Sequence, residues 1–388
     1  MKPRLTLNLG LRWEVYYPFS GMNNMTTFEQ GVQSTRFPGA PLGVLVSGDP
    51  GVPDGILHTS YTKFAPRVGF AYDVFGNWRT SLRGAYGLFY SATQSDIAGN
   101  MEQQPFSLVI TVNQTPNLNT PYAPAVDPFP YTVNLKNPTF VPGATMAGMA
   151  PNNSVVPYLE QYNFTVEQQF GENWSARIAY VGSMGHHFYL LRDENSPAYV
   201  PGASISSAGL NARRPIQPYA GISLWDTSSS SAFNSLQATI THRFTHGFSI
   251  NASYVWEKEM DNVSGDPTST TAFQLSNQNC VACDRGLSSL EIPQRFVASY
   301  LYALPETHAW GLLGKELLNG WQINGITTIA QGSPFNVTSG VDSNLDGIAT
   351  DRPDRVGNPN LGGGRSRAQK IAEYFNTAAF ADPAPNVP

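Results

Sequence analysis

The stretch that most constrains the fold is residues 232–260, where apolar and polar side chains alternate along two consecutive segments. The apolar positions of the second segment are Phe248, Ile250, Ala252, Tyr254 and Trp256. A period of two places one type of side chain on each face of a β-strand. Thr245, His246 and Gly247 lie between the segments, so the stretch predicts a β-hairpin with one apolar face.

The first segment of this hairpin follows the same rule. Its apolar positions are Leu236, Ala238, Ile240 and Phe244, and His242 is the exception among them. Each arm has about ten residues and carries rings near its ends, which is the length and pattern of a tilted strand that crosses a bilayer. The hairpin therefore predicts a membrane-spanning pair of strands.

Composition supports an all-β protein. Only 13% of the 388 residues are charged, 12% are aromatic, and 35 Gly with 30 Pro indicate many turns. Ile371, Tyr374 and Phe375 form the one apolar set at helical spacing. No apolar run is long enough for a transmembrane helix. A net charge of -5 argues against a nucleic-acid partner, because phosphate binding needs concentrated Lys and Arg.

Seven further segments show the same alternation, which gives about nine strands in all. They are residues 5–15, 65–75, 78–90, 158–170, 173–183, 294–304 and 320–330. Residues 106–112 are the clearest strand-like run within a very long loop. Short turns alternate with long excursions between the segments, and outer-membrane barrels have short turns on one side and long loops on the other.

This asymmetry predicts an all-β fold, a transmembrane antiparallel up-and-down β-barrel. The chain would supply about 9–10 strands of a larger barrel with long extracellular loops. Rings at opposite ends of one strand, such as Trp174 with Tyr180, fit the two interfacial girdles of such a barrel. The alternative is a secreted soluble β-sandwich that acts as a binding or adhesion protein.

Several blocks, in order along the chain, resemble the β-barrel of TonB-dependent receptors of the Oar-like type. They include RLTLNLGLRWE, EQYNFTVEQQF, FNSLQATITHRFTHGFSINASYVWEKEMD and DSNLDGIATDRPDRVG. The resemblance implies an outer-membrane transporter that takes up a bulky nutrient or ligand. It also implies a plug domain, absent from this chain, through which the TonB system supplies energy. Residues 1–332 would be the partial barrel, and residues 333–388 an extracellular loop region with a truncated C-terminus.

Both ends of the sequence suggest a fragment. Leu5, Leu7, Leu9 and Leu11 alternate with polar residues and Gly instead of forming the apolar segment of a signal peptide. Pro383, Pro385 and Pro388 exclude a paired closing strand at the other end. An open sheet edge in lipid costs several kcal/mol per unsatisfied backbone group. We therefore expect the remaining strands to come from outside this chain.

The candidate chemistry is sparse. Cys280 and Cys283 have metal-ligand spacing, but a zinc site needs two further ligands, so a disulfide is favoured in an oxidising exterior. His186 and His187 are adjacent on a strand and point to opposite faces, which favours a solvated strand end over a metal site. No nucleophile elbow, metal triad or close carboxylate pair suggests an enzyme.

Residues 342–347, with the sequence DSNLDG, match the first half of a calcium loop. Asp342, Asn344 and Asp346 occupy positions one, three and five, and a Gly follows at six. Position twelve is Pro353, where the pattern has a bidentate Glu, so Asp351 or Asp354 would have to substitute for it. The open alternative is a turn rich in Asn, Asp and Gly.

Overall fold

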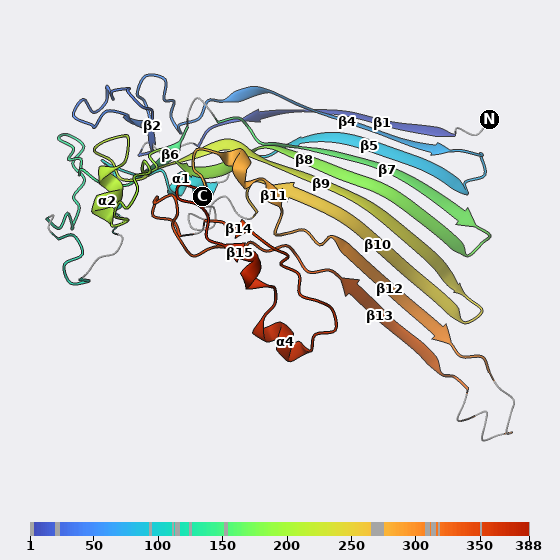
Figure 1. Cartoon of the computed structure of the whole chain (residues 1–388). Coiled ribbons are helices and arrows are strands. Elements are labelled where there is room, and N and C mark those ends of the chain that lie inside the picture. The colour runs from blue at the N-terminus through green and yellow to red at the C-terminus, as the bar shows by residue number, and fades with distance from the viewer. Residues whose placement is uncertain are drawn as a thin grey trace.

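The computed structural model describes residues 4–19, 24–92, 95–110, 112, 117–123, 126–150, 154–264, 275–306, 311, 316, 319–349 and 351–387. Its main feature is one large antiparallel sheet (Figure 1). The long strands, in sheet order, are β1 (Leu5–Tyr16), β4 (Ser60–Asp73), β5 (Thr80–Tyr90), β7 (Tyr158–Phe170), β8 (Trp174–Asp193), β9 (Ile222–Thr245), β10 (Phe248–Asp261), β12 (Gln294–Ala303) and β13 (Gln322–Ala330). Because sheet order equals chain order, every long strand pairs with the next one along the chain.

The two ends of the sheet have different connections. At the short-turn end, tight links join β4 to β5, β7 to β8 and β9 to β10, and the β12–β13 link lies partly outside the described residues. At the long-loop end, β1–β4, β5–β7, β8–β9 and β10–β12 are joined by long segments that gather on the opposite side of the molecule (Figure 1). The predicted up-and-down topology with unequal connections is confirmed.

The sheet is open in the described part of the chain, since β1 pairs only with β4 and β13 only with β12. It therefore forms part of a barrel wall, as expected. The sandwich alternative is wrong for the described residues, because the only other sheets there are two-stranded, β2–β3 and β14–β15. A sandwich needs a second sheet that covers the apolar face of the first.

Two details of the strand prediction are wrong. The described residues of the 106–112 run form a turn and irregular chain, and Phe106 packs in a loop core beside Phe37 instead of in a sheet. β8 and β9 continue well beyond the predicted segment ends, to Asp193 and from Ile222. The extension of β9 includes a run of Ser residues that shows no alternation of apolar and polar side chains. This run is nevertheless a strand because it pairs with β8.

At the long-loop end, short elements pack into what we call the loop cap. Its elements are β2 (Thr26–Phe28), β3 (Val44–Val46), α1 (Ser95–Gly99), β6 (Met146–Met149) and α2 (Ser207–Ala212). β6 runs parallel to the start of β9, with Met146 opposite Ile222. Two clusters of buried apolar side chains fill the cap, and Trp225, at 0% exposure, is among the largest. The long connections are therefore a folded layer with its own core.

The remaining elements follow β10. They are η1 (Val281–Asp284), β11 (Gly286–Leu287), β14 (Asp354–Arg355), α4 (Arg367–Ala372), η2 (Thr377–Ala379) and β15 (Phe380–Ala381). A capping box of Ser366 and Gln369 begins α4. The predicted apolar helical set is only partly helical, because α4 ends before Tyr374 and Phe375, which contact the Phe335 ring instead. In the described residues no helix is both long and apolar enough to cross a membrane.

Candidate functional site

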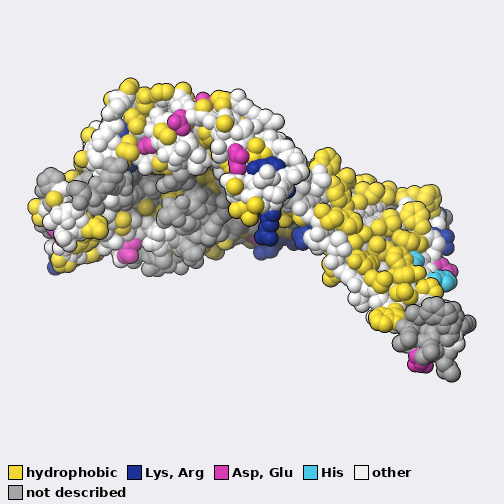
Figure 2. Space-filling model, turned by 60° about the horizontal axis from the view of Figure 1, so that its bottom comes forward, with side chains coloured by type: hydrophobic (Ala, Val, Ile, Leu, Met, Phe, Trp, Pro, Cys, Tyr) yellow, Lys and Arg dark blue, Asp and Glu magenta, His cyan; other side chains and the backbone are white. Residues whose placement is uncertain are grey.

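Strand register brings the alternating apolar positions into rows that run across one face of the whole sheet. The central row is Leu5, Tyr72, Leu82, Val166, Ile178, Ala238, Tyr254, Phe296 and Ile329. We call this side the apolar face. Many of its large side chains are exposed, and Figure 2 shows apolar side chains gathered over the strand part of the molecule. An exposed apolar surface of this extent marks a contact with lipid or protein.

A row of rings borders the apolar face at the short-turn end. Trp174 lies 4.4 Å from the His242 ring, and His242 lies 5.4 Å from Phe248, both measured between ring centroids. Phe248 in turn meets Tyr302 at 6.4 Å. His242, the polar exception in its strand, is therefore a buried member of this ring row, and its Nδ1 lies 3.2 Å from the Phe248 carbonyl oxygen.

A second row of rings borders the apolar face towards the long loops. The hydroxyls of Tyr162 and Tyr180 donate to the Asn234 side-chain oxygen at 3.1 and 2.6 Å, and the Tyr86 hydroxyl donates to Glu160 at 3.2 Å. Rings with an apolar body and a polar tip suit a membrane–water interface.

The height between the two ring rows fits a membrane. Tyr162 and Phe170, the cross-strand neighbour of Trp174, are eight positions apart on β7, and Val166 lies halfway between them. At about 3.3 Å per residue and a tilt of about 40°, the rows are about 20 Å apart in height. The apolar band of outer-membrane barrels is about 25 Å tall, so the two rows match its two borders.

Some rings on the apolar face lie directly over glycines of the neighbouring strand. A Cβ atom on Gly84 would come within 2.5 Å of the Phe70 ring, and one on Gly182 within 2.4 Å of the Tyr162 ring. Side chains at these positions would displace the rings. The glycines thus allow large rings to lie flat against the sheet.

The opposite face of the sheet is polar, and we call it the polar face. One of its rows is Ser81, Glu167, Arg177, Thr239, Ser253, Val297 and Thr328. Arg, Glu, Asn, Gln, Ser and Thr need water or polar partners, which the interior of a large barrel provides. The alternation read from the sequence therefore separates a lipid side from a wet side.

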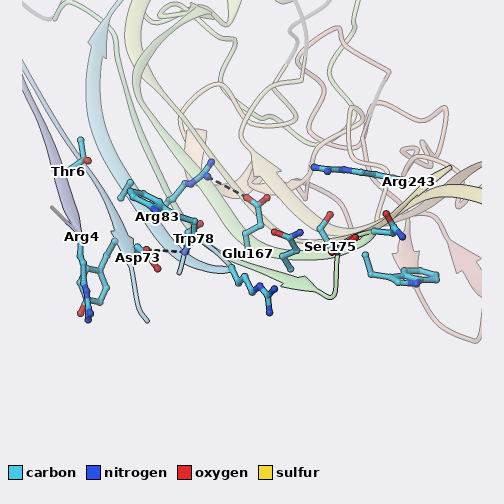
Figure 3. A pocket seen from close by; sticks show the side chains of 16 residues that line it. Arg4, Thr6, Asp73, Trp78, Arg83, Glu167, Ser175 and Arg243 are labelled. Carbon is cyan, nitrogen blue, oxygen red and sulfur yellow. Dashed lines mark hydrogen bonds and ion pairs between the residues drawn. The ribbon is translucent and has the colours of Figure 1, made fainter. Parts of the chain in front are cut away.

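A cavity of about 230 Å³ opens on the polar face near the short-turn end (Figure 3). Its charged side chains are Arg4, Arg79, Arg83 and Arg243, with Asp73, Glu167 and Glu172. Arg83 Nη2 lies 3.7 Å from Glu167 Oε2. The Asp73 carboxylate accepts hydrogen bonds from the backbone N–H groups of Gly76 at 2.9 Å and Trp78 at 3.1 Å, within its own turn. The sequence analysis missed this arginine cluster, since Arg4, the pair Arg79 and Arg83, and Arg243 come from three segments that are far apart in the sequence.

In the loop cap, Asp49 organises the turn after β3. Its carboxylate accepts the backbone N–H groups of Thr35 at 2.8 Å, Arg36 at 2.9 Å and Val46 at 2.9 Å. Burial alone would raise the pKa of Asp49, but the hydrogen bonds from Arg36 and Val46 outweigh it and hold the pKa below its usual range. This buried carboxylate is therefore charged at neutral pH, and its hydrogen bonds hold the turn together.

The structure places the other predicted residues as follows. Cys280 and Cys283 are joined in a disulfide at the start of η1, with Cα atoms 5.4 Å apart. The His186 ring stacks on Tyr158, with centroids 4.8 Å apart, and its Nε2 lies 3.5 Å from Glu160. His187 Nδ1 instead lies 3.3 Å from the carbonyl oxygen of Thr227. The two histidines thus have different partners.

The predicted calcium loop forms a compact structure, which we call the aspartate loop: residues 342–349 together with Asp351. Asp342 accepts the N–H groups of Asp346 at 3.0 Å and Gly347 at 2.8 Å. Asp351 accepts the Ser343 N–H at 2.6 Å. Burial raises the pKa of Asp346 to about 7, against hydrogen bonding by the Ile348 N–H, and the neighbouring Asp342 adds to the rise. Within the described residues, no group of three His, Cys, Asp or Glu is arranged to hold a metal ion.

One sheet with a bordered apolar band on one face and a polar opposite face defines the wall of a membrane-spanning β-barrel. The chain belongs to the outer membrane beta barrel domain family, whose profile matches residues 1–387. It is therefore an outer-membrane protein, and the predicted location and fold class are confirmed.

Among solved structures, the chain is similar to the outer membrane transporter YddB from Escherichia coli, with 12% identity over 63% of this chain and 28% of that chain and a TM-score of 0.38. It is also similar to the FrpB iron transporter from Neisseria meningitidis, with 10% identity over 78% and 29% and a TM-score of 0.36. For the alcaligin outer membrane receptor FauA from Bordetella pertussis, the identity is 12% over 78% and 32%, with a TM-score of 0.32. The chain thus spans about a third or less of these proteins. No protein of curated function matches the sequence.

Proposed function

We propose that this chain forms part of the barrel wall of a TonB-dependent outer-membrane transporter, which takes up a bulky ligand. The proposal rests on three features of the sheet: an apolar face about as tall as the hydrocarbon layer of a membrane, a charged polar face, and a packed loop cap at one end only. A wide barrel with a hydrated interior suits passage of a bulky solute, and loops on a rigid scaffold suit its selection. In this role the chain is a transport component and no enzyme.

The arginine-lined cavity supports the coupling part of this proposal. It lies on the polar face at the short-turn end, which is the periplasmic side of such a barrel. A plug domain that fills the barrel would contact this surface, and the TonB system would act through that plug. Four arginines against three acidic side chains favour a plug surface that contributes carboxylates.

The second half of the proposal concerns the extracellular side. Residues 333–388 would form an extracellular segment that joins the loop cap in ligand selection. Its Arg352 Nη2 lies 2.7 Å from the Asp284 carboxylate. Pro334, Phe335 and Asn336 line a cavity of about 400 Å³ together with Asp261, the last residue of β10, and residues that follow it. The ligand would therefore meet both the loops and the upper wall of the barrel.

Cysteine labelling in intact outer membranes tests the barrel wall. The native cysteines are joined to each other, so an introduced thiol is the only reactive one. Leu236→Cys lies on the apolar face and the adjacent Gln237→Cys on the polar face. We expect a hydrophilic maleimide to label Gln237→Cys and to label Leu236→Cys only after the membrane is dissolved. Equal labelling of both in intact membranes would contradict the proposed wall.

A third thiol tests the plug and its coupling. Ser175→Cys lines the arginine cavity. In the complete receptor we expect this thiol to be shielded from maleimide added to the periplasm, and we expect TonB-dependent energisation to increase its labelling. Labelling that is fast from the start, and unchanged when the plug is deleted, would show that nothing docks there.

A further inference from the structure

The cavity that residues 334–336 share with the end of β10 lies at the long-loop end of the sheet, and we call it the mouth cavity. Three parts of the chain line it: the end of β10 with the residues that follow it, the region of η1 and β11, and residues 334–336 with Arg352. Its volume of about 400 Å³ is near the lower end of the range for ligand sites, about 300–1,000 Å³. The mouth cavity therefore suits one part of a bulky ligand.

The charges that line the mouth cavity nearly cancel. The charged side chains in its lining are Asp261, Asp284 and Arg352. Arg352 Nη2 lies 2.7 Å from Asp284 Oδ1, so these two side chains neutralise each other. The Ser264 hydroxyl lies 2.9 and 2.8 Å from the two carboxylate oxygens of Asp261. A lining with one remaining carboxylate and no surplus cation does not favour an anionic ligand.

The polar groups of the mouth cavity include donors and acceptors that can still form hydrogen bonds. In the described part of the chain, the Asn336 amide and the Nε and Nη1 groups of Arg352 have no hydrogen-bond partner. The two Asp261 oxygens share one hydroxyl donor, although a carboxylate can accept about four hydrogen bonds. A hydroxyl group both donates and accepts, so it can meet a carboxylate and an amide or guanidinium side by side. This lining therefore favours a ligand with many hydroxyl groups.

A buried anchor holds Arg352 in position. Its partner Asp284 is 8% exposed and accepts the Ser276 backbone N–H at 3.0 Å and the Ser276 hydroxyl at 2.9 Å. Asp284 is the last residue of η1 and follows directly after the Cys280–Cys283 disulfide. Because one nitrogen of the guanidinium is fixed in this way, its remaining N–H groups lose little freedom when a ligand binds, which favours binding.

An exposed aromatic ring forms part of the wall of the mouth cavity. Phe335 is 57% exposed, and its ring centroid lies 5.9 Å from that of Tyr374 and 5.8 Å from that of Phe375. Leu287 of β11 also lines the cavity and is 52% exposed. A ring that is fixed by its neighbours and still exposed offers a rigid apolar surface, against which the C–H face of a sugar ring can pack.

We propose that the mouth cavity binds one end of a neutral oligosaccharide. Asp261, Asn336 and Arg352 form hydrogen bonds with its hydroxyl groups, and one sugar ring stacks on Phe335. The proposal rests on the proposed transport function and names the class of its bulky ligand. It requires a neutral ligand because the guanidinium in the lining is already paired with Asp284.

The test uses the complete receptor in detergent micelles and an array of immobilised oligosaccharides, built from glucose, mannose, galactose, xylose or N-acetylglucosamine. We expect saturable binding to at least one of these oligosaccharides, and we expect the same oligosaccharide in solution to compete for it. Ferric hydroxamate and catecholate chelates and the polyamine spermidine are tested beside them by isothermal titration calorimetry. Binding to none of the oligosaccharides, or binding to a chelate or to spermidine alone, would overturn the proposal.

Two pairs of variants locate the sugar, with the oligosaccharide that binds best as the probe. Asp261→Asn keeps the shape of the side chain and removes its charge, so we expect about tenfold weaker binding, whereas Asp354→Asn, exposed in β14 and outside the cavity, should bind normally. Phe335→Leu removes the ring and should weaken binding about fivefold, whereas Phe335→Tyr keeps the ring and should change little. Unchanged affinity in Asp261→Asn and Phe335→Leu, or equal losses within either pair, would refute the assignment.

The result is separable from the test of the barrel wall. If no oligosaccharide binds and the labelling of Leu236→Cys and Gln237→Cys is as expected, only the ligand class is refuted. Equal labelling of those two thiols would refute the transport proposal whatever the array shows. Binding by the unsubstituted receptor decides the ligand class even if a variant does not fold.

Discussion

Replacing Val166 by Arg tests the membrane assignment directly. Val166 lies halfway between the two ring rows on β7, so about 13 Å of strand, or about 10 Å of height, separates it from each row. A charged side chain can only partly reach water from there. Arg at the bilayer midplane of a barrel costs about 2–4 kcal/mol. Asn163→Arg, three positions away on the polar face of the same strand, should cost less than about 1 kcal/mol.

The assay is urea unfolding of the complete receptor in lipid vesicles, followed by tryptophan fluorescence. We expect the free energy of unfolding to fall by about 2–4 kcal/mol for Val166→Arg and to change little for Asn163→Arg. Asn163 is a suitable control because its cross-strand neighbours, Ala85 and Val181, are uncharged. Equal effects of the two substitutions, or a neutral Val166→Arg, would show that this row does not face hydrocarbon.

Three further substitutions test the packing. Asp49→Ala removes the acceptor for three backbone N–H groups, of which that of Val46 is buried, so we expect a loss of about 1–3 kcal/mol in the stability of the β2–β3 hairpin, seen as faster hydrogen exchange; unchanged exchange would argue against this role. The pKa of Asp49 is lowered in the folded protein, so the stability that its charged form gives the hairpin is fully present above the ordinary pKa of 3.8 and is lost as the pH falls through the lowered pKa. Protection of the hairpin from hydrogen exchange should therefore hold from pH 5 to 7. Trp225→Ala, at a fully buried site, should cost about 3–5 kcal/mol and lower the melting temperature of the loop cap, and an unchanged melting temperature would contradict this. Gly182→Val should cost about 1–3 kcal/mol in vesicle unfolding because its side chain would displace the Tyr162 ring, whereas Gly171→Asn, in a turn with positive φ and open space, should be nearly neutral.

The strands were predictable because their signal is local. Residues 158–170 were predicted as a strand and form β7 with the same bounds. Alternation also assigned the faces correctly, and turns such as His246–Gly247 fixed the hairpin partners. The run at residues 106–112 was misread because its apolar side chains serve a loop core, and apolar composition alone does not distinguish a strand from buried irregular chain.

The candidate sites were predictable only where their residues are close in sequence. Asp342, Asn344 and Asp346 form a spaced motif, so the loop could be recognised from residue types and spacing alone. That Asp351, and not Asp354, reaches this loop depends on the path of the chain between them. The arginine cavity draws on β-turns and strands far apart in sequence, and no spacing rule connects them.

The sequence by itself determined which side chains face lipid and which face water, because a strand reverses its side chains at every residue and short turns leave little freedom in pairing. The tertiary structure decided how β5 meets β7 across residues 91–157, how the loops pack around Trp225, and which carboxylates lie together in the aspartate loop. These contacts join segments that are far apart in the sequence through packing and shape. No repeating pattern of residues along the chain encodes them.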